Sequence, residues 1–201
     1  MLGFRGCSVS EAIAILRQDR NEKVVALTFD DGYRNFKTTV LPILNRYGFS
    51  ATVYVVTDLI GRHNQWDQGT GISPNPLMTA DEIRCCVSQD IEIGCHTATH
   101  ARLTDTHVDL NDEISRSKDL LETLTGKPVN AFCYPYGLHD DRVSNIVAQC
   151  GFSSATTMIR GRATATHNPL RLPRIPVTWH TLPHLFIIKL LTSYEDKRRK
   201  D

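Results

Sequence analysis

The segment Lys23-Val-Val-Ala-Leu-Thr-Phe29 is short, apolar and rich in β-branched residues, and Asp30-Asp-Gly32 follows it directly. Such a continuous apolar run predicts a strand that is buried on both faces. Buried strands of this kind occur in parallel sheets, and the carboxyl ends of parallel strands are where active sites form. The two aspartates therefore stand where chemistry is expected, although Asp-Asp-Gly alone is also an ordinary turn sequence.

Similar strand-like runs alternate with amphipathic helices along the rest of the chain. Strands are predicted over 51–57, 91–95, 131–134 and 153–157, and helices over 34–47, from 79 onward, 109–125 and 141–150. Glycines follow three of these helices, at 48, 126 and 151, as helix-ending residues commonly do. This alternation of strand and helix predicts a parallel sheet, either open or closed into a barrel.

The composition is that of an ordinary globular domain. The 201 residues are 41% hydrophobic and carry 23 lysines and arginines against 22 acidic residues, a net charge of +1. This length predicts a single domain over 1–201, with 190–201 as a solvated tail. The near-neutral charge argues against a nucleic-acid partner, and no apolar stretch approaches the roughly 20 residues that a membrane helix needs. The first residues lack the apolar core of a secretory signal, so we expect a cytoplasmic protein; the sequence does not determine its oligomeric state.

Two histidines follow the third predicted strand. His96 and His100 are four residues apart in Gly94-Cys-His-Thr-Ala-Thr-His-Ala-Arg-Leu103. This spacing brings two imidazoles to one side of a helical turn, which suits two nitrogen ligands of Zn²⁺, although unrelated surface histidines can share it. Because this motif and the aspartate pair both follow parallel strands, we expect them at the same end of the sheet. One aspartate with two histidines would make a three-ligand catalytic metal set.

Two further segments are candidates for the rim of such a site. The fourth predicted strand ends in Phe132-Cys-Tyr-Pro-Tyr-Gly137, where the proline fixes a turn and the glycine permits unusual dihedral angles. That turn can present a backbone N–H and aromatic rings to a site, or it can simply be packed by its tyrosines. The long connection over 58–76, which contains Trp66, is predicted to be either a functional loop or a disordered insertion.

Taken in chain order, the aspartate pair, the two histidines and the turn at Phe132–Gly137 resemble the motifs of the polysaccharide deacetylase family. These are the NodB-homology domains that remove acetyl groups from N-acetylated sugars. The resemblance extends from about Val24 to Val177 and takes in Glu113-Ile-Ser-Arg-Ser-Lys118 and Leu172-Pro-Arg-Ile-Pro176. It implies a distorted parallel (β/α) barrel with about seven units. It also implies an N-acetylated glycan as the substrate and, as the cofactor, zinc or another divalent transition metal.

The resemblance assigns roles to individual residues. Asp30 would be the general base, and the backbone N–H of Tyr136 would stabilise the oxyanion of the tetrahedral intermediate. Three residues would bind the metal: Asp31, His96 and His100. Apart from the resemblance, three residues are candidates for binding the substrate: Trp66, Tyr134 and Pro135. The two aromatic rings can stack on the face of a sugar, or they can simply pack in the protein.

Two positions depart from the family pattern. Many relatives have an arginine that braces the general base at the position of Cys133, and we expect Arg174 to reach Asp30 from another strand instead, unless it only forms a surface ion pair. The second departure concerns the general acid, because no late histidine is a clean match, in the expected apolar context, to the Leu-x-His motif of many relatives. Three histidines stay open for that role: His139, His180 and His184.

Three functions follow from these observations. The favoured one is a metal-dependent hydrolase that removes N-acetyl groups from a sugar or polysaccharide, with metal-activated water and an aspartate base. The second is a family amidohydrolase that acts on a smaller, non-sugar amide. The third is a catalytically impaired glycan-binding homologue, which the intact set of two aspartates and two histidines disfavours because binding alone does not need it.

Overall fold

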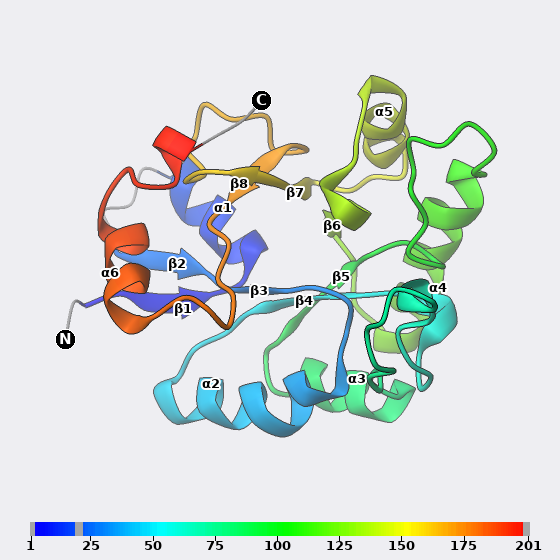
Figure 1. Ribbon diagram of the computed structural model, residues 1–201, viewed down its shortest axis with the longest axis horizontal. Coiled ribbons are helices and arrows are strands. Elements are labelled where there is room, and N and C mark those ends of the chain that lie inside the picture. The colour runs from blue at the N-terminus through cyan, green and yellow to red at the C-terminus, as the bar shows by residue number, and fades with distance from the viewer. Residues whose placement is uncertain (1–2, 19–21, 199–201) are drawn as a thin grey trace.

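The computed structural model describes residues 3–18 and 22–198, and its central feature is a parallel sheet of six strands (Figure 1). The strands lie in chain order, and each neighbouring pair is parallel. Their bounds are β3 Thr28–Phe29, β4 Thr52–Val55, β5 Glu92–Cys95, β6 Ala131–Cys133, β7 Ser154–Arg160 and β8 Leu172–Arg174. The sheet curves into a half-barrel whose edge strands, β3 and β8, do not pair. The predicted parallel α/β architecture of the NodB type is confirmed.

Helices cover the outside of this half-barrel, as Figure 1 shows for α2 to α5. The helices are α1 Val9–Arg17, α2 Leu41–Tyr47, α3 Ala80–Val87, α4 Ser117–Thr125, α5 Asp141–Gln149 and α6 Pro183–Leu191. Two of them begin with a π-helical turn, Phe36–Val40 before α2 and Asp112–Arg116 before α4. Among the described residues, no helix has the length and apolar character needed to cross a bilayer.

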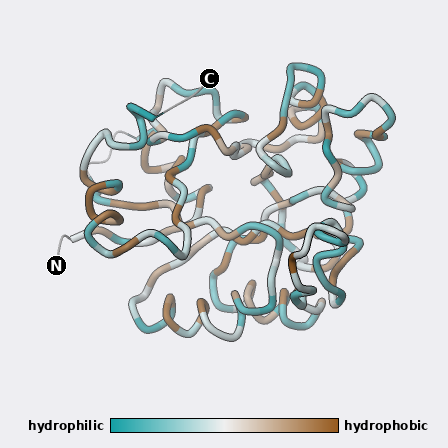
Figure 2. The backbone as a smooth tube through the Cα atoms, in the orientation of Figure 1, coloured by the Kyte–Doolittle hydropathy of each residue, from teal (hydrophilic) through white to brown (hydrophobic). Residues whose placement is uncertain are grey.

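The core lies between the sheet and these helices. Strand residues such as Val53, Ile93 and Phe132 are at most 5% exposed, and they pack with helix residues such as Ile83 and Leu121 in one cluster. Figure 2 shows hydrophobic stretches along the strands and alternating hydrophobic and hydrophilic stretches along the helices. This distribution is expected when strands are buried on both faces and helices on one.

The helix ends follow from local chemistry. Gly48 and Gly126 adopt left-handed backbone angles, with φ of 63° and 66°, directly after α2 and α4. Thr79 and Glu82 form a capping box at the start of α3, in which each side chain accepts a hydrogen bond from the other residue's backbone N–H. The same glycines and the Thr-x-x-Glu pattern can be recognised in the sequence, where they mark the ends of α2 and α4 and the start of α3.

The predicted strand over 23–29 is divided in two at Leu27. Its first half, β2 (Val24–Ala26), pairs with β1 (Arg5–Cys7) in a separate two-stranded parallel sheet. Its second half, β3, pairs with β4 in the main sheet. The chain therefore changes sheets just before the aspartate pair.

The prediction of a solvated tail over 190–201 is wrong within the described residues. Helix α6 continues to Leu191, and Glu195 is only 1% exposed. The Glu195 carboxylate pairs with Lys189 Nζ at 2.7 Å and with Arg160 Nη1 at 3.0 Å. These ion pairs hold the segment against α6 and β7, and residues 199–201 lie outside the described part.

Candidate active site

The predicted site residues lie at the carboxyl ends of four strands in the main sheet. Asp30 and Asp31 follow β3, His96 follows β5, Tyr134 follows β6, and Arg174 ends β8. Because all these strands are parallel, their carboxyl ends lie at the same end of the half-barrel. The fold thus brings together residues that are up to about 140 positions apart.

Asp31, His96 and His100 form a compact group of possible metal ligands. Asp31 Oδ1 lies 3.3 Å from His96 Nε2 and 3.4 Å from His100 Nε2. Both imidazoles are buried, and the three donor atoms lie within 4.8 Å of one another. One carboxylate oxygen with two imidazole nitrogens is a donor set that suits Zn²⁺ and related transition metals.

The surroundings of these three side chains fit a divalent cation. His96 Nδ1 donates a hydrogen bond to the Cys133 carbonyl at 2.7 Å, which leaves Nε2 to face Asp31 as a ligand atom. Burial lowers the pKa of His100 and so favours its neutral form, the form that binds metal. Burial alone would raise the pKa of Asp31, but its contacts with His100 and His96 hold that pKa below the usual value. Asp31 is therefore ionised at neutral pH.

Asp30 forms a bidentate ion pair with Arg174. Arg174 Nη1 and Nη2 donate to the two carboxylate oxygens at 2.6 and 2.8 Å, and Nε donates to the Thr157 carbonyl at 2.8 Å. The predicted contact between Arg174 and Asp30 is thus present. Arg174 Nη2 also lies 3.4 Å from Cys133 Sγ, so the guanidinium sits beside the residue that replaces the family arginine. Burial would raise the pKa of Asp30, but the positive charge of Arg174 outweighs it and lowers that pKa.

Unusual backbone angles concentrate in these loops. Asp31, Thr97, His100 and Tyr136 have φ between 58° and 74°, and only one further non-glycine residue in the described ranges has a positive φ. Each such residue costs on the order of 1–3 kcal/mol and persists only where its surroundings hold it in place. Asp31, His100 and Tyr136 have roles predicted from the sequence. The strained backbone therefore lies at residues that are predicted to bind the metal or to stabilise the oxyanion.

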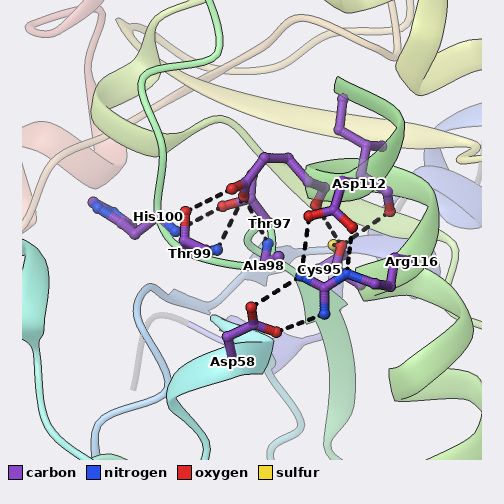
Figure 3. A network of polar contacts seen from close by, with 11 residues as sticks. Asp58, Cys95, Thr97, Ala98, Thr99, His100, Asp112 and Arg116 are labelled. Atoms are coloured by element: carbon purple, nitrogen blue, oxygen red, sulfur yellow. Dashed lines mark hydrogen bonds and ion pairs between the residues drawn. The ribbon is translucent and has the colours of Figure 1, made fainter. Parts of the chain in front are cut away.

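Glu113 holds the loop that joins the two histidines. It is buried on the π-helical turn before α4, and its Oε2 accepts hydrogen bonds from the backbone N–H groups of Ala98 and Thr99 at 3.0 and 2.9 Å. Its Oε1 accepts from Thr99 Oγ1 at 2.5 Å, and the His100 N–H donates to Thr97 Oγ1 at 3.0 Å. Figure 3 shows this network around residues 97–100. The sequence places Glu113 among apolar positions of its helix, but it gives no sign of which backbone groups the side chain would bind.

A second part of the same network anchors the start of α4. Arg116 donates to both carboxylate oxygens of Asp58 at 2.8 and 2.9 Å, and its Nε donates to Asp112 at 2.7 Å (Figure 3). Asp58 begins the long connection over 58–76. The helix that carries Glu113 is thereby tied to that connection.

Aromatic rings surround His100. The Trp66 ring stacks on the His100 ring with centroids 4.4 Å apart, and the Tyr136 ring meets it edge-on at 4.6 Å. Trp66 reaches this position because the 58–76 connection is well ordered. Within it, the buried Asn64 donates to Asp67 and accepts from the Asn75 N–H, both at 2.6 Å. These contacts favour the prediction of a functional loop over that of a disordered insertion for this segment.

Two predicted substrate-binding residues are inaccessible. Tyr134 is 1% exposed, and its hydroxyl donates to the Leu170 carbonyl at 2.9 Å. Pro135 is buried as well. The burial of both residues contradicts the predicted substrate contacts: Tyr134 packs in the core beside Phe132, and Pro135 is buried directly after it.

The structure separates the three candidate histidines for the general acid from the metal group. His139 Nδ1 donates to the Gly137 carbonyl at 2.9 Å, and its ring stacks on buried Tyr134. The His180 ring lies tilted against that of Trp179, and His184 is exposed on α6. Within residues 3–18 and 22–198, no contact joins any of the three to Asp31, His96 or His100, so the structure assigns the acid to none of them.

A family model for polysaccharide deacetylases matches residues 17–155. The chain belongs to the polysaccharide deacetylase family. Members of this family are hydrolases that act on N-acetyl groups. This deacetylase-family chain is 25% identical to the Bacillus subtilis protein YxkH, which is named for the same activity, over 179 residues covering 88% of this chain and 60% of YxkH. It is 26% identical to the peptidoglycan-N-acetylglucosamine deacetylase of Bacillus cereus over 136 residues, 67% of this chain and 56% of that one.

Solved structures of the family share the fold. The Streptococcus pyogenes deacetylase PplD in complex with acetate superposes with a TM-score of 0.79 and 26% identity, over 94% of this chain and 80% of PplD. A polysaccharide deacetylase from Bacillus cereus gives 0.77 and 26%, over 92% of this chain and 56% of that one. The chain thus spans 56 to 60% of the length of the two curated relatives described above.

Proposed function

We propose that the chain is a metal-dependent hydrolase that removes N-acetyl groups from an N-acetylated sugar or polysaccharide. The observation that carries this proposal is the convergence of two groups at one end of the half-barrel: the Asp31, His96 and His100 ligand set and the Asp30–Arg174 ion pair. Membership of the polysaccharide deacetylase family supports the substrate class.

Asp31, His96 and His100 would hold the metal, and zinc suits their donor atoms. When bound, such an ion supplies a Lewis acid that lowers the pKa of a coordinated water to about 7. The hydrogen bond from His96 Nδ1 to the Cys133 carbonyl orients one imidazole for this task.

Asp30 would act as the general base that accepts a proton from the attacking water. A carboxylate offers about four lone-pair sites, and the two hydrogen bonds from Arg174 leave the others free to accept that proton. Arg174 is thus a positioning residue, because it fixes the carboxylate and keeps it ionised. The ion pair therefore keeps Asp30 in the ionised form that a base needs at neutral pH, while the lowered pKa weakens its affinity for the proton.

The remaining roles belong to the rim of the site. The left-handed backbone at Tyr136 turns its peptide group away from the line of β6, and we assign its N–H to the oxyanion that forms on the acetyl carbonyl. Trp66, stacked on His100, offers an aromatic face against which a sugar ring can pack.

Metal analysis combined with acetate-release assays tests this proposal. We expect about one zinc ion per chain after reconstitution, as for a three-ligand catalytic site, and acetate release from N-acetylglucosamine oligosaccharides. Asp31→Ala should lose the metal, whereas Asp30→Asn should retain it and lower kcat by about 10²- to 10⁴-fold. Asp119→Asn, which removes an exposed carboxylate on α4, is the matched control. A protein that binds no stoichiometric metal would contradict the mechanism, and a metal-loaded protein that releases no acetate would contradict the substrate.

A further inference from the structure

Exposed apolar side chains gather on one segment of the protein. More than half of the large hydrophobic side chains that are exposed in the described ranges lie between residues 177 and 191. They are Val177, Trp179, Leu182, Phe186, Ile187, Ile188 and Leu191. We call this group the α6 face, because most of its members lie on that helix. Single exposed apolar residues are ordinary, whereas a group of this kind marks an interaction surface.

Helix α6 carries its charged side chain inward and its aliphatic side chains outward. Lys189 is buried, and its Nζ contacts Glu195 and the Pro176 carbonyl. Ile187 and Leu191 lie four residues apart, and therefore on one face of the helix, and each is 45% exposed. Figure 1 shows α6 at the edge of the molecule, and Figure 2 shows it as hydrophobic. This is the reverse of an ordinary surface helix, which turns polar side chains to water.

A cavity of about 220 Å³ adjoins α6 and carries a net positive charge. Its lining includes Arg160, Lys189 and Arg198. The single carboxylate in the lining is that of Glu195. Hydroxyl groups also line the cavity, and Arg198 Nη1 donates to that of Tyr194 at 2.6 Å. Three cations against one anion suit the phosphate of a lipid headgroup, which accepts hydrogen bonds from arginine and from hydroxyl groups.

The exposed charges beside the α6 face are cations as well. Lys197 and Arg198 are exposed a few residues after the helix. The acidic residues of that stretch are engaged, because Glu195 is buried in its ion pairs and Asp196 pairs with Arg162 at 2.8 Å. The whole chain has a net charge of only +1, so the positive charge at this place is a local concentration.

An apolar face bordered by cations has the chemistry of a surface that binds anionic lipids. Aliphatic side chains enter the boundary between headgroups and acyl chains, while lysine and arginine are attracted to the negative surface. Trp179, which is 87% exposed, has the amphipathic ring that is favoured at headgroup level. Helix α6 has 9 residues, far fewer than the roughly 20 that span a bilayer, so it would lie along the surface.

A second copy of the chain suits this face less well. Self-association through the same face of each copy is two-fold symmetric, so it would bring the two cationic borders together. Like charges that face each other across an interface are destabilising. An anionic bilayer instead supplies the opposite charge.

We propose that the α6 face binds the surface of a bilayer that contains anionic lipids, with a headgroup phosphate in the cavity beside Arg160 and Arg198. Arg160 ends β7 and Arg174 ends β8, and these two residues are partners in the sheet. Because Arg174 also holds Asp30, the α6 face borders the end of the half-barrel that carries the proposed active site. The bound chain would therefore act close to the membrane surface.

Co-sedimentation with vesicles tests the proposal. The wild type should bind vesicles of phosphatidylcholine mixed with phosphatidylglycerol more tightly than vesicles of phosphatidylcholine alone, and added salt should weaken the binding. Ile187→Ser combined with Leu191→Ser should reduce the binding constant by about 10-fold or more, since two aliphatic side chains no longer enter the bilayer. Lys197→Gln combined with Arg198→Gln should reduce it by about 10- to 30-fold, as expected for two lost charges near the surface.

Two variants serve as matched controls. Ile43→Ser removes an exposed aliphatic side chain from α2, and Lys127→Gln removes an exposed charge shortly after α4. Both should bind as the wild type does. The fluorescence of Trp179 reports the contact directly, because its emission should shift to shorter wavelength with anionic vesicles, and this shift should be absent in Trp179→Phe.

Binding that is equal for the two kinds of vesicle, or unchanged in either double variant, would overturn the proposal. Analytical ultracentrifugation without lipid tests the other occupant. A wild-type dimer that becomes monomeric in the Ile187→Ser, Leu191→Ser protein would also overturn the proposal, because a second copy would then cover the face. None of these measurements uses acetate release, so the membrane surface and the proposed function can fail separately.

Discussion

Arg174 reaches Asp30 from the last strand of the sheet, whereas the resemblance in sequence implies an arginine at the position of Cys133. The guanidinium lies beside the Cys133 sulfur, so both arrangements would deliver the positive charge to the same place. In either arrangement Asp30 would receive a positive charge and two donated hydrogen bonds. Which strand carries the arginine does not change these contacts. This explains how a chain with cysteine at that position can keep an ordered, ionised base.

Replacing Arg174 tests this positioning role. In Arg174→Met, Asp30 loses its two hydrogen bonds and its counter-charge, and we expect kcat to fall by about 10²-fold with the metal content unchanged. The acid limb of the pH–rate profile should also move to higher pH, because the charge that lowers the pKa of Asp30 is gone. Steady-state kinetics across pH, together with metal analysis, measure both effects.

Arg171→Met is the matched control, because Arg171 pairs with the exposed Asp141 away from the base. Adding Cys133→Arg to the Arg174→Met protein should restore part of the lost rate, since it returns an arginine to the family position. An unchanged kcat in Arg174→Met would show that the ion pair has no part in the reaction.

The sequence predicts some of these residues well and others poorly. Asp31, His96 and His100 could be placed together because each follows a parallel strand, and the topology fixes where strand ends meet. Tyr134 and Pro135 could not be placed, since the direction of a side chain after a three-residue strand depends on packing rather than on pattern. The contacts of Glu113 were also beyond reach, because two of the three hydrogen bonds that its carboxylate accepts come from backbone N–H groups, which carry no sequence signal.

At the scale of elements, the loop between β5 and α4 relies on the helix that follows it. Thr97 and His100 both have left-handed backbone angles, and Glu113 accepts hydrogen bonds from the two residues between them. Glu113 lies on a π-helical turn, a feature that is frequent at functional sites. The helix thus helps to hold His100 in the orientation in which it can bind metal.

Glu113→Gln tests this support. Glutamine keeps the size of the side chain but replaces one acceptor oxygen with an N–H₂ donor, which would face backbone N–H or hydroxyl donors. We expect metal affinity to fall by about 10- to 100-fold, the usual effect of altering a residue that orients a metal ligand. Competition with a chromophoric chelator measures the affinity, and Asp119→Asn on the same helix serves as the control. Equal metal affinities in Glu113→Gln and the wild type would show that the network contributes only to folding.

Some of the elements that the sequence missed show no visible pattern, although α1, which Ser8 caps, was missed as well. β1 and β8 have three residues each, too few for a period to appear, and β8 contains Pro173. Helix α6 is apolar on nearly all sides, so it shows no amphipathic pattern. The longer helices and central strands were predictable because their periodicity and end signals agree.

At the scale of the whole molecule, the carboxyl-terminal segment is held by a buried ion pair. Lys189 and Glu195 are 7% and 1% exposed, and Lys189 Nζ also donates to the Pro176 carbonyl at 2.6 Å. Burial would raise the pKa of Glu195, but its hydrogen bond with Lys189 and the nearby charges lower it below the ordinary value of 4.5. The pair therefore contributes its full stabilisation above about pH 4.5 and loses it as the pH falls through the lowered folded-state pKa.

Glu195→Gln should lower the free energy of unfolding at pH 7 by about 3 kcal/mol, because Lys189 would stay buried without its partner. The difference from the wild type should shrink below pH 4.5, where the wild-type carboxylate also becomes neutral. Urea denaturation of both proteins at several pH values measures this difference. A gap that stays constant down to acidic pH would mean that the charge of Glu195 is not what stabilises the segment.

Side chains join the two edge strands of the half-barrel, which do not pair with each other. Arg174 at the end of β8 donates to Thr28 Oγ1 in β3 and to Asp30 just after it, so the proposed catalytic base also joins the two edges of the open seam. This arrangement constrains evolution. A descendant that abandoned catalysis would still be selected to keep Asp30 and Arg174 for the integrity of the barrel, whereas Asp31, His96 and His100 would be free to drift. In a lineage of such chains, loss of the metal ligands should therefore precede loss of the base.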